Sequence, residues 1–566
     1  MAAGDVGAVV ALSAMPSILR RTMRLLKVPS CDEPFEEGPK VATRGWRRTK
    51  AGQVLALALL LALVGSLAPA ALVATAGMLV GLVVFGGQSA LSGAGSVVSA
   101  LVISLVLLAP MLVPAVLAGG AGLGVFGAAV APWSEPGIGG LVRFAVGPSG
   151  SSVLAWLLPA AALVPIVVAR GARLQLAVRL LGVAIASLAM GLMVARGGLG
   201  SFAPDLLVVL APAATAIAAM VGLGLAAFEV DVPGIRFGWR QLVALGGISA
   251  SLIGVTPLLG NVVSGRWNMP QSGYGDALTF LNGPQLAGHR VLWLGDPRGI
   301  PGGSWTISPG LAWATSTGGL PSSTNLFVPP APTAGSAVTD AIDLAMQGST
   351  VRLGRLLAPT GISAIVVVTA AAPEVAGIQM PARLSPPPSL IPALQQQTDL
   401  VEVPGSGGSV IFEVSHSIPM VGVRSAPLGN GARPTDPLVS AGWTDLGGIA
   451  AQGGTAPAGS TTGYIGLAPA GAFSLSSPEG TPPTASAFGW AATTKVSAGT
   501  VRLKLDVLPL AGLLNAVTLV AWLVVALCLL GRHRWLDWWW PLRRRHRIPA
   551  VSSSGVADDS NGEDGP

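Results

Sequence analysis

Acidic side chains are the groups in this chain best suited to act as a general base, and they are scarce in its first half. No Asp or Glu occurs between Lys50 and Glu135, and Asp205 is the next carboxylate along the chain. A general base must lie within hydrogen-bond reach of the proton that it removes. Glu135 and Asp205 are therefore the two candidates for this role, although a lone carboxylate in a loop is usually only solvated.

The spacing of the glycines, carboxylates and histidines gives little support for a metal site or a nucleotide-binding site. The segment Gly122–Gly127 matches GxGxxG, but its neighbours are apolar runs rather than a strand, so close helix packing or a loop is the better interpretation. Glu229 and Asp231 form the nearest match to a metal-binding carboxylate pair, and capping of a helix end explains them better. We expect no metal site and no cofactor, because the histidines are far apart and without ligand spacing: His289, His416, His533 and His546.

Aromatic and basic residues near the C-terminal end have the composition of a membrane interface. They are Trp535, Trp538, Trp539 and Trp540, followed by Arg543, Arg544 and Arg545. Such belts anchor a protein at the lipid headgroups, and recognition of a lipid or of a partner is the alternative. Trp239 and Arg240 allow the same two interpretations.

A third pair of polar residues follows an apolar segment that reads as a strand, His289–Pro297. Asp296 and Arg298 stand at its end. Ligand-contacting residues are often found at the carboxyl ends of strands in α/β layers. The simpler alternative is an ion pair that stabilises the turn.

The elements that position these residues are dominated by long apolar runs. The 566 residues are 51% hydrophobic and 10% charged, whereas soluble domains carry roughly 25% charged residues. Runs of about 20 apolar residues predict membrane-spanning helices, because the backbone must satisfy its own hydrogen bonds in lipid. We expect a polytopic α-helical membrane protein of about eight spans. The spans are 51–69, 72–87, 97–119, 151–169, 177–195, 205–228, 240–263 and 511–531, and 120–132 is the alternative to 72–87 as the second span.

Basic clusters flank the first and last spans and predict the orientation. Arg and Lys collect on the cytoplasmic side of membrane proteins, so both termini are expected in the cytoplasm of a plasma-membrane protein that contacts membrane lipid and no nucleic acid. The basic segment 1–50 contains an apolar periodicity over 5–29, which predicts an amphipathic helix on the inner membrane surface.

The polar region between the last two spans should fold outside the membrane. Strand, helix and strand patterns over 264–435 predict an α/β layer with partly parallel pairing, and short strands between turns over 436–510 predict a β-sandwich. The predicted organisation starts with the basic lead 1–50 and the membrane domain 51–263. The α/β domain 264–435 and the β-sandwich 436–510 follow outside the membrane. The final helix is 511–531, and 532–566 is a cytoplasmic basic and aromatic segment with a disordered tail.

The chain resembles the C-terminal membrane half of large actinobacterial family-2 glycosyltransferases of the cell envelope. The similarity lies in Ala227–Glu229 with Phe237–Gln241, in Val291–Pro297, in Leu357–Ile362, and in the order of the elements. None of these segments is a catalytic signature. In that family a nucleotide-sugar-binding catalytic domain precedes the membrane half, and it is missing from this sequence.

The resemblance implies a role in envelope polysaccharide or glycolipid assembly, with spans that handle a polyprenyl-linked sugar. It also implies that a separate family-2 catalytic subunit supplies the transfer chemistry, unless the chain is a split copy. Two alternatives remain. One is an autonomous glycosyltransferase that uses a lipid-linked sugar, with Glu135 or Asp205 as base. The other is a glycan or lipid transporter, although ionisable residues are rare within the spans.

Overall fold

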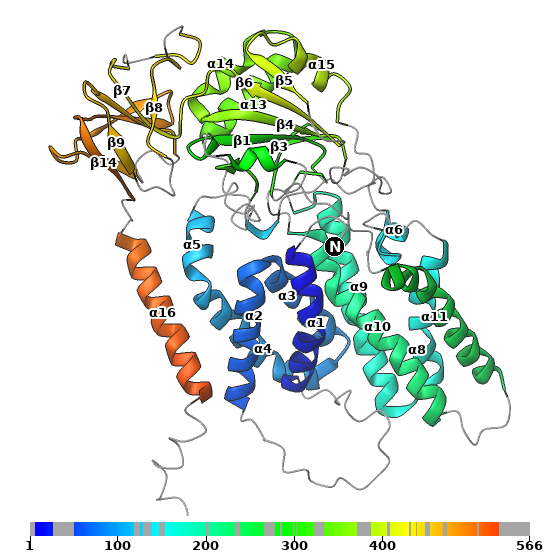
Figure 1. Ribbon diagram of the computed structural model, residues 1–566. Coiled ribbons are helices and arrows are strands. Elements are labelled where there is room, and N and C mark those ends of the chain that lie inside the picture. The colour runs from blue at the N-terminus through cyan, green and yellow to red at the C-terminus, as the bar shows by residue number, and fades with distance from the viewer. Residues whose placement is uncertain are drawn as a thin grey trace, which may run out of the picture.

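The computed structural model describes most of the helices and strands of the chain. The described residues are 6–26, 50–117, 125–127, 137–145, 153–199, 202, 204–231, 238–264, 278–283, 286–297, 299–300, 303–308, 310–321, 333–370, 386–404, 408–428, 432–436, 439–447, 453–467, 473–505 and 509–530. A bundle of helices forms one part of the molecule, and two β-sheet units lie together at one end of it (Figure 1).

The helices of the bundle are apolar along most of their length. They are α1 (Val6–Leu25), α2 (Lys50–Leu67), α3 (Ala70–Val84), α4 (Gly87–Leu107), α5 (Ala109–Leu117), α6 (Ile138–Val142), η2 (Val153–Trp156), α7 (Leu157–Ala162), α8 (Val164–Val168), α9 (Gly171–Ala195), α10 (Leu206–Asp231), α11 (Trp239–Ser264) and α16 (Pro509–Leu530). Among the described residues four helices are long and apolar enough to cross a membrane, at Lys50–Leu67, Ala90–Leu107, Gly171–Ala195 and Leu206–Glu229. The chain is therefore a membrane protein, and the count of eight spans stays a prediction.

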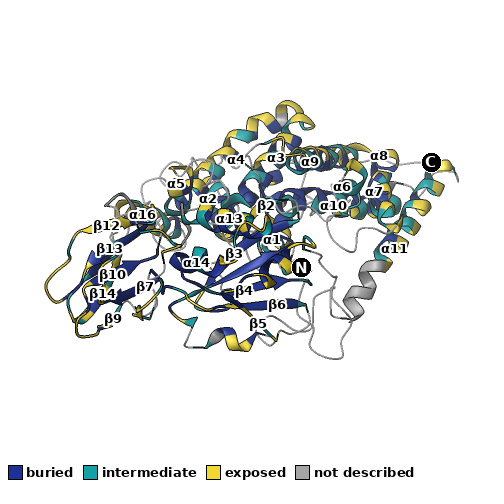
Figure 2. Cartoon of the chain, turned by 90° about the horizontal axis from the view of Figure 1, so that it is seen from above, coloured by how far each residue is buried: buried dark blue, intermediate teal, exposed yellow. Residues whose placement is uncertain are grey.

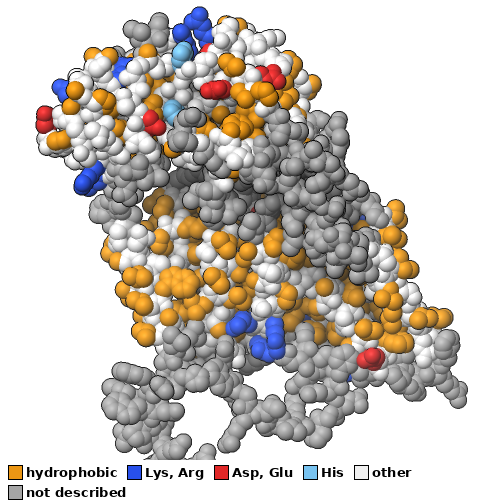
Figure 3. All heavy atoms as spheres, in the orientation of Figure 1, with side chains coloured by type: hydrophobic (Ala, Val, Ile, Leu, Met, Phe, Trp, Pro, Cys, Tyr) orange, Lys and Arg blue, Asp and Glu red, His pale blue; other side chains and the backbone are white. Residues whose placement is uncertain are grey.

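Each predicted span overlaps one or more helices, and prolines lie near the points where two of the spans are divided. Span 97–119 is split into α4 and α5 just before Pro110, and span 151–169 is split among η2, α7 and α8, with Pro159 and Pro165 inside it. Proline has no N–H to continue the helical hydrogen bonds, and its ring clashes with the preceding turn. Figure 3 shows hydrophobic side chains over the visible face of the bundle, with Lys and Arg near the end away from the sheets.

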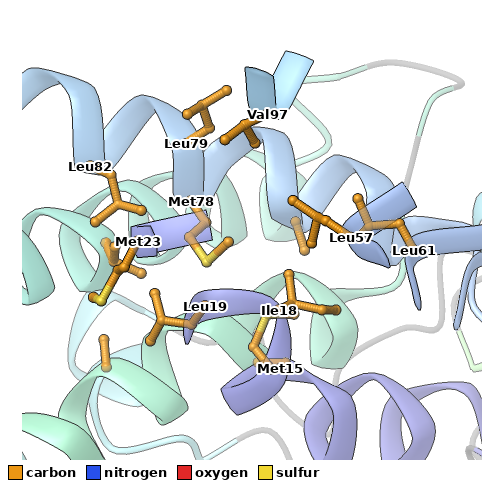
Figure 4. Packing of buried hydrophobic residues seen from close by; sticks show 14 of the residues in the cluster. Met15, Ile18, Leu19, Met23, Leu57, Leu61, Met78, Leu79, Leu82 and Val97 are labelled. Atoms are coloured by element: carbon orange, nitrogen blue, oxygen red, sulfur yellow. The ribbon is translucent and has the colours of Figure 1, made fainter. Parts of the chain in front are cut away.

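The lead helix α1 lies where the sequence did not place it. The segment was expected on the inner membrane surface, but in the structure it packs inside the bundle against α2 and α10. Met15 and Ile18 are completely buried in the same cluster as Leu57 and Leu61 of α2 (Figure 4). The described ends of the chain, at α1 and α16, lie at opposite ends of the bundle (Figure 1). The predicted side of the two termini stays a prediction, because residues 1–5 and 531–566 lie outside the described residues.

The first sheet unit is an α/β layer. Its elements are η3 (Thr279–Asn282), β1 (Arg290–Gly295), β2 (Trp305–Ser308), β3 (Leu311–Thr317), α13 (Thr333–Met346), α14 (Leu353–Leu357), η6 (Ala358–Thr360), β4 (Ile362–Val368), α15 (Leu390–Gln395), β5 (Leu400–Val403) and β6 (Ser409–Val414). The six strands run in the order β2-β3-β1-β4-β6-β5, and β1 pairs with β4 in parallel. This confirms the predicted partly parallel pairing.

Alternation along the strands gives this sheet two buried faces, which Figure 2 shows as dark blue strands. On β1, Leu292 and Leu294 pack with α13, α14 and α15 in one apolar cluster. Val291 and Trp293 point to the other face, where Leu278 and Leu281 of the η3 segment cover them. Successive side chains of a strand face opposite sides, so a strand with two covered faces is apolar throughout, as β1 is.

The second unit is a pair of sheets that share a core. Its strands are β7 (Val421–Arg424), β8 (Thr444–Asp445), β9 (Gly453–Ala456), β10 (Thr462–Ile465), β11 (Phe473–Ser476), β12 (Thr484–Ala487), β13 (Ala491–Lys495) and β14 (Gly499–Leu505), in sheets of five and three strands. Val423, Ile465, Leu475 and Val501 lie in one apolar cluster that joins the two sheets, as a sandwich requires.

Two details of this unit differ from the sequence prediction. Strand β7 pairs with β10, so the sandwich already includes Val421 and does not begin at 436. The apolar segment 487–492, whose composition suits one of the short strands predicted over 436–510, instead contains a turn between β12 and β13, in which Phe488 has a φ of 54°. The apolar residues there are buried because they close the turn over the core, and not because they alternate along a strand.

Candidate functional site at the sheet end of the bundle

The carboxyl edge of the parallel pair β1 and β4 holds the first candidate residue. Gly295 ends β1 opposite Val368 of β4, and Asp296 follows directly. Gly295 has a φ of 146°, and a Cβ on it would lie 2.8 Å from the carbonyl oxygen of Val368. Only glycine fits this bend. The bend places Asp296 at the carboxyl edge of β1 and β4, the only parallel strand pair among the described residues.

Asp296 is a buried acidic residue at this edge. It is 3% exposed, and its backbone carbonyl accepts the N–H of Gly299 at 2.9 Å, which closes a turn. A buried carboxylate needs hydrogen-bond or ionic partners, and Asp296 makes further interactions in the structure. Arg298, the predicted companion, lies outside the described residues, so their predicted ion pair or shared ligand contact stays a prediction.

Asp205 lies at the start of α10, at the end of the bundle that faces the sheets (Figure 1). Its Oδ1 accepts the N–H of Leu207 at 2.8 Å, the bond of a helix N-cap. Its own N–H donates to the carbonyl of Phe126 at 3.0 Å. Asp205 thus joins the short described segment 125–127 to the first turn of α10.

Gly127, the last glycine of the GxGxxG match, is explained by this contact. It has a φ of 142°, and a Cβ on it would lie 2.5 Å from the backbone nitrogen of Asp205. Phe126 and Phe202 stack edge to face nearby, with ring centroids 5.2 Å apart. Close packing, the simpler of the two interpretations, therefore accounts for Gly127; the glycines of the match at 122 and 124 lie outside the described residues.

Trp239 and Arg240 lie at the opposite end of the bundle, where α11 begins. The Trp239 side chain is 61% exposed, and the Arg240 guanidinium lies 5.7 Å from the centroid of its ring. The N–H of Gly238 donates to Oε1 of Gln241 at 3.1 Å, which caps the helix start. The structure thus separates these two residues from Asp205 and Asp296 by the length of the bundle.

The remaining candidate residues lie outside the described part of the chain. They are Glu135 and the aromatic and basic segment with Trp535, Trp538, Trp539, Trp540, Arg543, Arg544 and Arg545. Their proposed roles stay predictions. Within the described ranges, no group of three or more His, Cys, Asp or Glu residues is arranged to hold a metal ion.

A polar joint between the α/β layer and the sandwich was not anticipated from the sequence. The hydroxyl of Tyr464 in β10 donates to the carbonyl of Pro359 at 2.6 Å. The Arg290 guanidinium at the start of β1 donates to the carbonyl of Thr360. Burial lowers the pKa of Arg290 to about 10, with Tyr464 opposing the shift, and burial raises the pKa of Tyr464.

His289 extends the joint beside Arg290. Its Nδ1 and the Oγ of Ser417 are 3.1 Å apart, and the donor depends on the tautomer. Burial lowers the pKa of His289, and Asp445 of β8 and the backbone of Gly361 offset part of the shift. No local pattern reveals this joint, because its residues come from segments far apart in the sequence.

Neither a protein-family model nor a curated protein sequence matches the chain. Among solved structures, the chain is similar to the cryo-EM structure of the arabinofuranosyltransferase AftD from Mycobacteria, with 15% sequence identity and a TM-score of 0.33. The similarity covers 74% of this chain and 32% of that one, so the chain spans about a third of the length of that protein. At this level the likeness carries no argument about activity.

Proposed function

We propose that this protein is a membrane component of a glycosyltransferase system for cell-envelope polysaccharide or glycolipid assembly. Its bundle handles a polyprenyl-linked sugar, its sheet units contact the glycan, and a separate family-2 catalytic subunit supplies nucleotide-sugar chemistry. The protein is oriented in the plasma membrane with its sheet units outside. The observation that carries the proposal is the placement of the α/β layer and the sandwich at one end of an apolar helical bundle (Figure 1). Asp205 caps the start of α10, and Asp296 follows the end of β1 in the α/β layer.

The contacts between the α/β layer and the sandwich support a fixed relative position of the two units, against which a glycan could bind. Tyr464 of the sandwich donates to the carbonyl of Pro359 in the α/β layer, and beside it Arg290 donates to the carbonyl of Thr360 within that layer. His289 of the layer contacts the hydroxyl of Ser417, in the segment that leads to β7. A rigid joint of this kind fixes the carboxyl edge with Asp296 relative to the sandwich. A lipid-linked sugar, whose lipid lies between helices and whose sugar lies above them, fits such an arrangement.

The test is the composition of the envelope glycan in a strain that lacks the protein. We expect a loss of one type of glycosidic linkage, restored by the wild-type gene. Asp296→Asn should restore less than wild type, while Glu402→Gln, an exposed carboxylate on the edge strand β5, should restore fully. Unaltered linkages in the deletion strain would refute the proposal. Co-purification of a family-2 glycosyltransferase with the full chain tests the partner.

Autonomous transfer from a polyprenyl phosphate donor is the second candidate. Purified protein that transfers sugar without any partner would establish it, and loss of this activity in Glu135→Gln or Asp205→Asn would identify the base. A transporter ranks third. Arg179, an ionisable residue within α9, is 8% exposed, and its Nη2 lies 3.5 Å from the carbonyl of Gly86 in the α3–α4 turn. Arg179 thus links α9 to the turn between α3 and α4, which explains this buried ionisable residue without a transport role.

A further inference from the structure

The lead helix α1 runs along the bundle from one end to the other, and its contacts fix its direction. Near its start, Ala11 lies in a buried cluster with Ala68 at the end of α2, Ala71 at the start of α3 and Val208 at the start of α10. These helix ends face the sheet units (Figure 1). The first turns of α1 therefore lie at the sheet end of the bundle.

The other end of α1 lies at the far side. A Cβ on Gly93, near the start of α4, would lie 2.6 Å from the carbonyl of Leu25 and 2.7 Å from the Cα of Leu26. Between the two ends, Met15, Ile18 and Leu19 pack in the main cluster with α2 and α3 (Figure 4). Helix α1 is thus antiparallel to α2 and α4 over their length.

We propose that α1 crosses the membrane, with its start on the side of the sheet units and its end on the side of the cytoplasm. Its 20 residues extend about 30 Å, which equals the thickness of the hydrocarbon core. A helix on the membrane surface would lie across the ends of the other helices. Instead, α1 is wedged lengthwise between α2 and α10.

The polar residues of α1 fit this crossing. Arg20, Arg21 and Arg24 fall in its last two turns, at the same end as Arg170 and Arg173 before and within α9. Arginines at the cytoplasmic end of a helix extend their charge to the interface. These arginines also make α1 less apolar than the four helices that are long and apolar enough to cross a membrane. In the apolar part, the Ser13 hydroxyl donates to the carbonyl of Val10 at 2.9 Å, so it is satisfied within the helix.

Two consequences follow, one for the segment after α1 and one for a partner. The segment between α1 and α2, which contains Cys31, then faces the cytoplasm. Resting on the proposed function, a catalytic subunit that uses cytoplasmic nucleotide sugars must meet the chain at the end of the bundle where Arg20, Arg21 and Arg24 lie.

Cysteine labelling of the full chain in right-side-out membrane vesicles tests the crossing with a membrane-impermeant maleimide. The chain contains two cysteines, so Cys528→Ser leaves Cys31 as the inner probe. In the background with both cysteines changed to Ser, Ala3→Cys is the outer probe. Ala485→Cys, an exposed residue of β12, and Glu229→Cys, an exposed residue at the end of α10, are the matched outer and inner controls.

We expect Ala3→Cys to react in intact vesicles as Ala485→Cys does, and Cys31 to react only after permeabilisation, as Glu229→Cys does. Reaction of Ala3→Cys only after permeabilisation, or of Cys31 in intact vesicles, would overturn the proposal. If Ala3→Cys reacts only after denaturation, a cysteine in a Ser-Gly extension ahead of Met1 replaces it, with the same two outcomes. Labelling does not depend on glycan synthesis, so its result is separate from that of the proposed function.

Discussion

The crossing of α3 and α9 depends on two glycines that let the helix backbones touch. A Cβ on Gly81 would lie 2.5 Å from the carbonyl oxygen of Gly182, 2.8 Å from its carbonyl carbon and 3.0 Å from the Cα of Val183. All three atoms belong to backbone, so no side chain can turn away. Small residues allow such close helix packing in membranes, and Gly81→Ala should force the two helices apart.

The size of the effect follows from this geometry. Ordinary van der Waals contacts of a Cβ begin at 3.4 Å, so the new methyl group is about 0.9 Å too close to the Gly182 oxygen. Overpacking of a core costs about 1–3 kcal/mol, and a rigid backbone neighbour puts Gly81→Ala near the upper value. Alanine also gains about 1 kcal/mol of helix propensity over glycine. A control with the same gain and no clash is therefore needed.

Gly222→Ala is that control, because Gly222 lies within α10 and nothing is found within 4 Å of a Cβ built on it. The propensity gain cancels between the two variants, which leaves the clash. Melting of the full chain in detergent, followed by size-exclusion chromatography of the heated samples, should place the melting temperature of Gly81→Ala about 2–3 °C below that of Gly222→Ala. Equal melting of the two variants would refute the close approach of α3 and α9.

Three further predictions concern the joint and the last helix. Tyr464→Phe removes the hydroxyl that donates to Pro359 and should lower the unfolding free energy by about 1–3 kcal/mol, measured by denaturant melts in detergent; no change would contradict a buried bond. Because the pKa of His289 is lowered, the folded state binds fewer protons than the unfolded state, and the unfolding free energy should rise with pH in the range below 6.5. Wild-type protein should therefore melt at a lower temperature at about pH 5 than at about pH 7.5, and His289→Gln should reduce this difference. Trp522→Phe removes the indole donor 3.4 Å from the carbonyl of Leu107 and should cost about 0.6–2 kcal/mol in the same melts, or nothing if α16 stands apart from the bundle.

The helices were predictable because lipid leaves the backbone few choices. A run such as 51–69, which is long and uncharged, must be helical if it lies in lipid. The strands β1 and β4 were predictable for a related reason: a strand buried on both faces is a continuous apolar run. The hairpin of β2 and β3 was missed because Trp305–Thr317 is rich in Thr and Ser and turns at Gly310, whose φ is 77°. Nothing in its local pattern separates it from a loop.

The placement of α1 and the joint could not be predicted, for a different reason. The arginines of α1 look interfacial until its neighbours are known, because only the contact with α2 and α10 shows that the helix lies lengthwise. In the joint, Tyr464 and Pro359 are more than a hundred residues apart in the sequence. A hydrogen bond to a backbone carbonyl requires no particular residue type at the acceptor, so one of the two partners leaves no trace in the sequence.

The two interpretations of Asp205 can now be weighed against each other on geometry. One of its carboxylate oxygens accepts the N–H of Leu207, and its backbone N–H donates to the carbonyl of Phe126. A carboxylate used as a helix cap is fixed in direction by the helix, whereas a general base must point at the proton of a bound substrate. The cap explains the aspartate without any substrate, so the autonomous-enzyme hypothesis depends on Glu135. Asp205→Asn, which keeps a capping oxygen, should therefore leave both stability and any sugar transfer near wild type, and a large loss of transfer with normal melting would return Asp205 to the role of base.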